Sequence, residues 1–194
     1  MMKKMLLFAI IFAFSVPVAN AQYGAWTGNA NFFIGGKFLP SIDWSPTENQ
    51  LCFGGKFDFR PSSWPINFAF DVYYSSDDDR IYFSGPSPLQ TRATTTELCF
   101  GIRKVMDAVP FFHPYFGGGF AYINADAELS GQGNRVSDSD WSPGFWFSGG
   151  ANWILADHIN VGFDVGYSYA RVDLFTEEVQ GGGFRIGAMG GFHF

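Results

Sequence analysis

Apolar residues recur at every second position in separate segments all along this chain, and this period of two limits its fold more than any other feature. In the stretch INFAFDVYYS, for example, Ile66, Phe68 and Phe70 alternate with Asn67 and Asp71. Successive side chains of a β-strand point to opposite faces, so such a segment predicts a strand with one apolar and one polar face. Eight segments show the pattern: 26–38, 51–60, 66–75, 94–104, 115–123, 144–155, 160–169 and 183–194. We therefore expect an all-β fold.

The composition agrees with strands and argues against two other classes of protein. The 194 residues include 24 Gly and 24 Phe, and aromatic residues make up 20% of the chain, which favours strands and tight turns over helices. The formal net charge of −6 argues against a nucleic-acid-binding surface, which needs a basic patch. The mean hydropathy of +0.03 is too low for a bundle of membrane-spanning helices.

The N-terminal segment has the three parts of a secretory signal peptide. Lys3 and Lys4 provide the positive charge, the stretch MLLFAIIFAFSVPVA is the apolar part, and Ala19-Asn20-Ala21 is a small-x-small cleavage site. A membrane-anchoring helix is the alternative, but no basic stop-transfer flank follows the cleavage site. We expect a cleaved signal peptide over residues 1–21 and a single domain over residues 22–194.

The alternating segments and their connections have the lengths found in transmembrane β-barrels. A tilted strand of about ten residues crosses a bilayer. The connections at 61–65, 106–112 and 155–159 are short, whereas those at roughly 39–50, 76–93, 123–144 and 170–183 are long. Short turns at one rim and long loops at the other are typical of outer-membrane barrels. We therefore predict an eight-stranded antiparallel up-and-down transmembrane β-barrel, with both termini at the rim of the short turns.

A secreted β-barrel of the lipocalin type is the alternative fold. Its apolar face would point inward around a ligand, and its outer face would be polar. In this chain one face carries more Phe than a solvated surface can explain, and the other face carries charges of both signs. An apolar outside and a polar inside therefore fit better.

The export signal, the eight alternating segments, the stretch HPYFGGG (113–119) and the terminal GGFHF (190–194) together resemble a known family. The chain is similar to the small eight-stranded outer-membrane barrels of Gram-negative bacteria, the OmpA- and opacity-type group, here expected without a periplasmic domain. The resemblance implies a bacterial outer-membrane location and contact with membrane lipid and lipopolysaccharide. It also implies periplasmic chaperones and the barrel assembly machinery as partners during biogenesis, and no cofactor. A barrel closes on itself, so we expect a monomer.

The polar faces of the predicted strands carry four acidic and four basic residues that would meet inside the barrel. An eight-stranded barrel is just wide enough for its own side chains to fill it, and a buried charge without a partner is costly. The short turn at 61–65 permits a register in which Lys56 faces Asp71. We expect a closed ion-pair network, with a gated ion path as the alternative. Its residues are Lys56, Asp58, Arg60, Asp71, Glu97, Arg103, Asp164 and Arg185.

The chain ends inside its last alternating segment, on an aromatic residue. We expect this segment to close the barrel against the first strand, because an open edge in lipid would leave backbone N–H and C=O groups without partners. The pattern also resembles the C-terminal signal recognised by the outer-membrane assembly machinery, in which a terminal Phe is prominent. The signal residues would be Phe184, Ile186, Phe192 and Phe194.

The residues that could support catalysis or metal binding are few and are poorly placed. His113, His158 and His193 all map to the rim of the short turns, which is the wrong end for chemistry on the outer leaflet. They come from separate turns without a metal-ligand spacing, so we predict no metal site and no catalytic residues.

Two short sequences occur twice. For the acidic outer loops that contain the second of them, DWSP, we expect solvated turns, with a surface that binds a divalent ion or a host ligand as the alternative. LCFG at 51–54 and 98–101 places Cys52 and Cys99 on strands separated by a third strand, too far apart for a disulfide, so we expect two free buried thiols. DWSP at 43–46 and 140–143 suggests that Trp44 and Trp141 pack on one another above the rim.

These observations favour a non-enzymatic outer-membrane barrel with a structural or surface-interaction role. A narrow channel for ions or small solutes is the alternative, and a lipid-A-modifying enzyme is the third hypothesis. A closed network or a continuous water path through the lumen distinguishes the first two.

Overall fold

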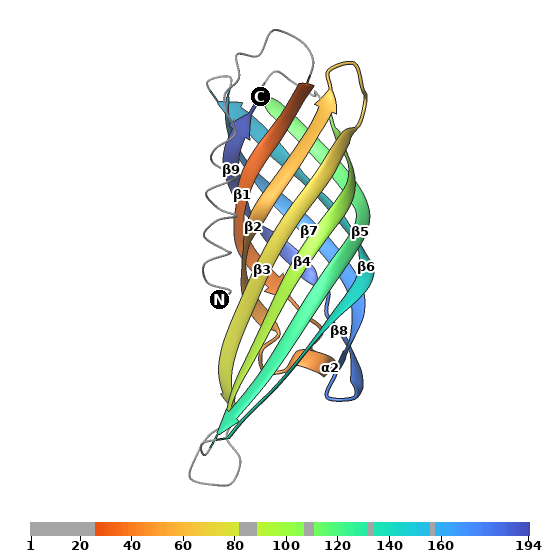
Figure 1. The fold of residues 1–194 in the computed structure, drawn as a ribbon. Coiled ribbons are helices and arrows are strands. Elements are labelled where there is room, and N and C mark those ends of the chain that lie inside the picture. Colours follow the sequence, from red (N-terminus) through yellow and green to blue (C-terminus); the bar gives the residue numbers. More distant parts are fainter. Residues whose placement is uncertain (1–25, 82–88, 107–110, 132–133, 156–157) are drawn as a thin grey trace, which may run out of the picture.

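Eight strands form one closed antiparallel ring, as the alternation predicts (Figure 1). The computed structural model describes residues 26–81, 89–106, 111–131, 134–155 and 158–194, so the predicted signal peptide lies outside the described residues. The ring consists of β1 (Trp26–Phe38), β2 (Asn49–Pro61), β3 (Asn67–Ile81), β4 (Leu89–Val105), β5 (Phe112–Gly131), β6 (Asn134–Leu155), β7 (Ile159–Leu174) and β9 (Phe184–His193). Outside the ring lie the short helix α2 (Ser41–Trp44) and the short strand β8 (Glu177–Gln180), which pairs with β7. Among the described residues, no helix is long and apolar enough to cross a membrane.

The last strand closes the ring, as we expected. Each strand from β1 to β7 pairs with the next, and β9 pairs with both β7 and β1. Phe194 continues this ladder, because its N–H donates to the Gly28 carbonyl at 3.0 Å and its carbonyl accepts from the Gly28 N–H at 2.9 Å. The final residue of the sequence is therefore part of the barrel wall.

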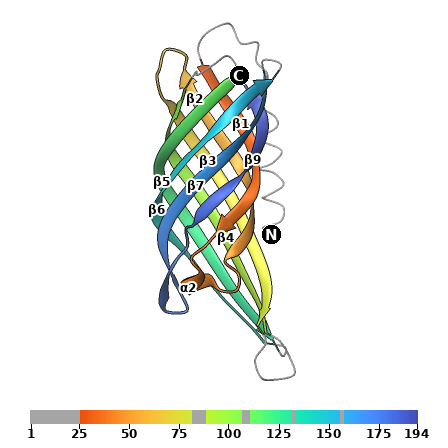
Figure 2. The same ribbon diagram turned by 180° about the vertical axis from the view of Figure 1, so that it is seen from behind.

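The two ends of the barrel differ greatly in length (Figures 1 and 2). We call the end that carries Trp26, the turn from Pro61 to Asn67 and Phe194 the terminal end, and the opposite end the distal end. At the distal end β3, β4, β5 and β6 continue together well beyond the other strands, and we call this part the β3–β6 extension (Figure 1). Both termini of the ring lie at the end of the short turns, as predicted.

The predicted long loops are mostly strand, which corrects the sequence analysis. Of the segments read as loops at 76–93, 123–144 and 170–183, β3 reaches Ile81, β5 reaches Gly131, β6 begins at Asn134, and β7 and β8 form a hairpin. Strands β5 and β6 are 20 and 22 residues long, about twice what a membrane crossing needs. Backbone pairing continues beyond the ring because each antiparallel pair can extend as a hairpin.

The outer and inner faces of the wall have opposite character. On β5, the outward-facing Phe120 is 81% exposed, while the next residue, Ala121, faces inward and is 3% exposed. Outward-facing rings contact one another across neighbouring strands, as Phe70 does with Phe100 at 4.9 Å between ring centroids. The buried residues that face inward include most of the chain's described ionisable groups between the two ends. This apolar outside and polar inside is the polarity of a membrane barrel.

The seam between β6 and β7 opens toward the distal end. Their ladder runs from Leu155–Ile159 to Gly144–Ala170, and Pro143 follows at once. Proline has no N–H and is tolerated in a sheet only at an edge or a bulge, so β6 pairs only with β5 beyond this point. The Asp140 carboxylate then accepts the N–H of Asp173 at 3.1 Å, and the Asp138 carboxylate accepts the N–H of Phe175 at 2.7 Å. Side chains of β6 thus replace the missing ladder bonds.

Candidate functional site

The lumen holds two groups of buried charges, and the group nearer the terminal end is the larger. It consists of Lys56, Asp58, Asp71, Arg103 and Asp164, all 3% exposed or less. Lys56 Nζ lies 2.6 Å from an Asp164 oxygen and 3.6 Å from an Asp71 oxygen. The Arg103 guanidinium bridges Asp71 at 2.6 Å and Asp58 at 3.2 Å. Each charge therefore has an opposite charge within ion-pair distance, as burial in a low dielectric requires.

The second group lies nearer the distal end and is centred on Glu97. Lys37 Nζ lies 2.7 Å from one carboxylate oxygen of Glu97, and Arg185 Nη1 lies 2.8 Å from the other. The Ser168 hydroxyl also donates to Glu97 at 2.9 Å, and Lys37 donates to the Thr95 hydroxyl at 2.6 Å. Glu97 thus binds two cations that come from the strands on either side of the closing seam, β1 and β9.

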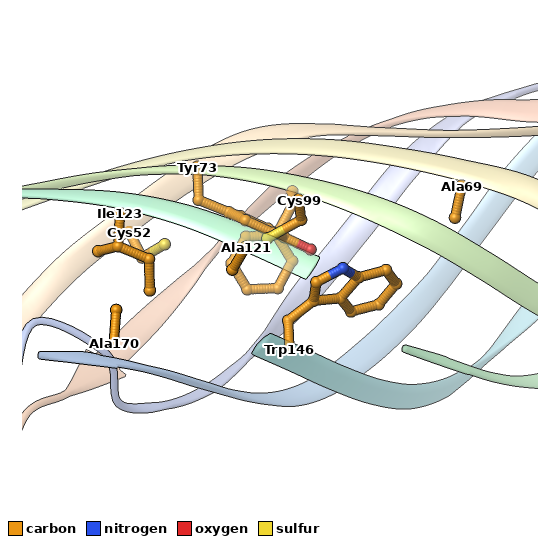
Figure 3. Close-up of a cluster of buried hydrophobic side chains, with 9 residues drawn as sticks. Cys52, Ala69, Tyr73, Cys99, Ala121, Ile123, Trp146 and Ala170 are labelled. Atoms are coloured by element: carbon orange, nitrogen blue, oxygen red, sulfur yellow. The ribbon is translucent and has the colours of Figure 1, made fainter. Parts of the chain in front are cut away.

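A cluster of aromatic and small side chains is also buried in the lumen (Figure 3). Tyr73 and Trp146 extend into the lumen from β3 and β6, and both cysteines lie in the same cluster (Figure 3). Tyr73 joins the two charge groups, because its hydroxyl accepts a hydrogen bond from Lys56 at 3.1 Å and its ring centroid lies 3.6 Å from the guanidinium carbon of Arg185. Cys52 and Cys99 are free and fully buried, as expected.

The structure brings together seven of the eight residues expected in the lumen network and leaves out Arg60. Arg60 lies at the terminal rim, where its guanidinium donates to the Trp64 carbonyl at 2.6 Å. It is the residue before Pro61, where β2 ends, so its side chain lies beside the turn and lines the cavity at the terminal end of the lumen. Lys37 supplies the fourth cation instead. Lys37 alternates with Phe38 at the end of β1, and alternation alone does not show that its long side chain reaches Glu97.

The predicted register between β2 and β3 is correct, but it does not decide the ion pairing. Lys56 stands opposite Asp71 and Asp58 stands opposite Ala69 in the ladder. The shorter contact of Lys56 nevertheless goes to Asp164 on β7, because a lysine side chain can cross a narrow lumen. Asp71 is held instead by Arg103 on the neighbouring strand β4.

An apolar cluster lies at the distal end of the lumen. The segment between β1 and β2 folds inward there, and Trp44 of α2 is 5% exposed. Its indole N–H donates to the Gln180 carbonyl at 2.7 Å, and the Gln180 N–H donates to Asp43 at 3.1 Å. The cluster consists of Leu39, Trp44, Ala93, Ala125, Val172 and Leu174. A hydrated ion entering from this end would meet apolar side chains before it reached the charges.

The expected contact between Trp44 and Trp141 is absent, which corrects the structural interpretation of the repeated DWSP. Trp141 faces outward and stacks on Tyr122 with 5.0 Å between ring centroids, whereas Trp44 is buried in the apolar cluster at the distal end. The first DWSP belongs to a connecting segment with α2, and the second lies within β6. The same four residues therefore occupy unrelated environments.

At the terminal end the lumen narrows to a small cavity of about 110 Å³. Asn29 and Asn67 line it and both donate to the same carboxylate oxygen of Asp58, which lies above the cavity. His113 and His193 also line it, and the His193 N–H donates to the His158 carbonyl at 2.7 Å, so the three histidines lie at this end as predicted. Among the described residues, no group of three or more His, Cys, Asp or Glu side chains is arranged to hold a metal ion.

Comparisons with known proteins agree with this geometry. The model of a family described as outer membrane protein beta-barrel domain matches residues 6–192. No curated protein matches the chain at a significant level. OprG of Pseudomonas aeruginosa shares the fold at 12% identity with a TM-score of 0.58, and the match covers 88% of this chain and 96% of OprG.

Two further solved structures share the fold at similar sequence identities and TM-scores. One is the attachment invasion locus protein Ail of Yersinia pestis, in complex with the heparin analogue sucrose octasulfate. It is 13% identical to this chain with a TM-score of 0.55, and the match covers 88% of this chain and 99% of Ail. The other is Neisserial surface protein A, which is 12% identical to this chain with a TM-score of 0.50. The match covers 86% of this chain and 96% of the Neisserial chain. At these identities the likeness is one of fold.

Proposed function

Because this chain belongs to the outer membrane protein β-barrel domain family of the bacterial outer membrane, we propose that it is a non-enzymatic barrel with a closed lumen and a structural or surface-interaction role. The terminal end then faces the periplasm and the distal end faces the outside. In this orientation the β3–β6 extension and the β7–β8 hairpin are the parts that meet the environment (Figure 1).

The observation that carries the proposal is the filling of the lumen. Four buried cations and four buried anions pair with one another, and the apolar cluster around Trp44 lies between them and the outside. Moving an ion through would require breaking several buried ion pairs, each of which would leave a charge without its partner. The alternative, a narrow channel, needs a continuous polar path, and the Trp44 cluster interrupts it.

The placement of polar groups also supports a non-enzymatic role. The three histidines lie at the periplasmic end, away from any substrate in the outer leaflet or outside. The charged groups of the lumen are already engaged with one another and are not open to a substrate.

The external surface of this barrel is acidic. Over the described residues of 39–48, 76–81, 89–94, 124–131, 134–143 and 171–180, twelve carboxylates stand against four arginines. A polysulfated ligand such as the one bound to Ail needs a predominantly basic surface. We therefore expect partners that cover a wide area of this surface to be neutral or cationic.

A measurement of ion flux into a population of vesicles tests whether the lumen is closed. The purified barrel is reconstituted into vesicles that contain an ion-sensitive dye, with a general porin as the conducting control. We expect dye quenching at the rate of protein-free vesicles. Quenching that rises with the amount of barrel incorporated would support the channel instead.

A further inference from the structure

The β3–β6 extension carries a pocket of about 380 Å³ that the lumen does not explain. This volume lies in the range of ligand sites. The lining contains only polar residues: Asp78, Asp79, Arg80, Gln90, Thr91, Arg92, Glu128, Ser130 and Arg135.

The sheet register brings the three arginines together from three strands. One row across the sheet places Arg92 of β4 between Asp78 of β3 and Glu128 of β5. The next row toward the tip begins with Arg80 on β3 and ends with Arg135 on β6, with Gln90 and Ser130 between them. Three of the four external arginines of the described chain therefore surround one pocket on an otherwise acidic surface.

The pocket faces outward, toward the space around the barrel. Arg135 lies six residues from Trp141 on β6, and Glu128 lies six residues from Tyr122 on β5, so each shares a face with the stacked pair Tyr122 and Trp141. Aromatic residues on the outer face mark the membrane interface of such barrels. Six residues of a tilted strand rise roughly 15 Å, so the pocket stands just above the outer leaflet, beside the sugars of neighbouring lipopolysaccharide.

The chemistry of the lining favours a sugar that carries phosphate. A lining without apolar side chains offers nothing to an acyl chain, whereas carboxylates, amides and hydroxyls match sugar hydroxyl groups as acceptors and donors. Guanidinium groups bind phosphate with two parallel hydrogen bonds. Arg135 forms an exposed ion pair with Glu128, and Arg80 and Arg92 line the same pocket, so three guanidinium groups lie around one space.

We propose that this pocket binds a phosphorylated sugar of the lipopolysaccharide core in the surrounding leaflet. The proposal rests on the outer-membrane placement in the proposed function and not on whether the lumen conducts. The pocket would fix the β3–β6 extension against the lipopolysaccharide layer.

The test compares a pocket variant with a matched arginine variant. The triple variant Arg80→Gln, Arg92→Gln, Arg135→Gln removes the three guanidinium groups, and Arg171→Gln is the control, because Arg171 is an exposed external arginine that pairs with Glu178 outside the pocket. Both variants and the wild type are placed in lipid nanodiscs and checked for folding by circular dichroism. Binding of purified phosphorylated core oligosaccharide, and of the same oligosaccharide after phosphatase treatment, is measured by calorimetry.

We expect the triple variant to bind the phosphorylated oligosaccharide at least tenfold more weakly than the wild type and the control. We expect phosphatase treatment to weaken binding to the wild type and the control by a similar factor. Equal binding by all three folded proteins, or no effect of phosphatase, would overturn the site.

A second arm tests the source of the ligand. In nanodiscs with lipopolysaccharide that retains or lacks the phosphorylated core, amide exchange of the β3–β6 extension should be slower with the full core in the wild type and in the Arg171→Gln control, but not in the triple variant. Binding of free oligosaccharide without this difference would overturn the membrane source. Either result is independent of the conductance of the barrel.

Discussion

The charged side chains of the lumen are held across its width as well as between neighbouring strands. Lys56 and Asp164 lie on β2 and β7, and Lys37 and Glu97 lie on β1 and β4, yet these pairs are separated by 2.6 and 2.7 Å. Such pairs tie distant parts of the ring to each other. A residue that pairs across the lumen therefore contributes to the closure of the whole barrel, and not only to the hairpin that contains it.

The first prediction concerns the preferred partner of Lys56. Lys56→Ala should lower the free energy of unfolding by about 3–5 kcal/mol, because Asp164 loses the cation with which it pairs. In double-mutant cycles, the coupling between Lys56 and Asp164 should exceed that between Lys56 and Asp71, since Asp71 keeps Arg103. Urea unfolding of protein refolded into lipid vesicles measures both couplings.

The control for this cycle is Arg171→Ala, which breaks an exposed ion pair and should change stability little. Equal coupling energies would show that the contact of Lys56 with Asp164 across the lumen is no stronger than its contact with Asp71.

The second prediction concerns the space that glycine leaves in the wall. A Cβ at Gly187 would lie 2.7 Å from the ring of Phe33 and 2.3 Å from the carbonyl oxygen of Ile34, whereas a Cβ at Gly190 would meet only the Asn160 carbonyl at 3.6 Å. Gly187→Ala should therefore destabilise the barrel by about 1–3 kcal/mol through overpacking, and Gly190→Ala should be close to neutral. The same vesicle unfolding assay compares the two variants, and equal effects would contradict the packing argument.

At the scale of elements, the β7–β8 hairpin depends on side chains of another strand. Beyond Pro143, the Asp138 and Asp140 carboxylates accept the N–H groups of Phe175 and Asp173 in place of a backbone ladder. The turn of the hairpin places Phe175 and Thr176 at positive φ, of 50° and 73°, which is unfavourable for an aromatic and for a β-branched residue. The two aspartates thus stabilise a turn in which Phe175 and Thr176 adopt a backbone conformation that is unfavourable for these residues.

The third prediction tests this fastening. In the double variant Asp138→Ala, Asp140→Ala, amide exchange of Asp173 and Phe175 should be at least tenfold faster, while amides of the membrane-spanning ladders keep their protection. Ser139→Ala is the control, because Ser139 lies between the two aspartates and its side chain faces the opposite side of β6. Unchanged exchange in the double variant would mean that the hairpin holds its shape without β6.

The fourth prediction separates two roles of the last residue. The backbone of Phe194 makes two hydrogen bonds with Gly28, so deleting the residue would weaken closure as well as any assembly signal. Phe194→Ala keeps this backbone and removes only the ring, which we expect to cost about 1.5–3 kcal/mol. Under the proposal that Phe184, Ile186, Phe192 and Phe194 form an assembly signal, the amount assembled in cells should fall much more than stability in vesicles.

The control is Phe163→Ala, which removes an outward-facing ring on β7, away from the chain end. An equal loss of assembly in both variants would argue for a general effect of ring removal and against recognition of the terminus.

At the scale of the whole molecule, the sequence predicts the parts of the structure that follow from a period of two. The ring of eight strands, the inward position of Asp71 and Glu97, and the placement of both termini at one end all follow from alternation and turn length. The partner of Lys56 could not be predicted, because alternation gives the face of a side chain but not its reach across the lumen. The position of Trp44 could not be predicted either, because it lies in a connecting segment without periodicity. Alternation predicts the face of Arg60 but not its partner, because Arg60 lies at the rim, where the Trp64 carbonyl is within reach.

We infer that the lumen is closed to ions. The paired charges, the buried cluster that contains Tyr73 and Trp146, and the apolar cluster around Trp44 would all lie on the path of a permeating ion. Single-channel recording in planar lipid bilayers tests this claim most directly, with the wild-type barrel inserted from detergent and a general porin as the positive control. We expect a flat baseline with no conductance steps from the inserted barrel. Reproducible steps of uniform size, whose number rises with the amount of barrel inserted, would contradict it.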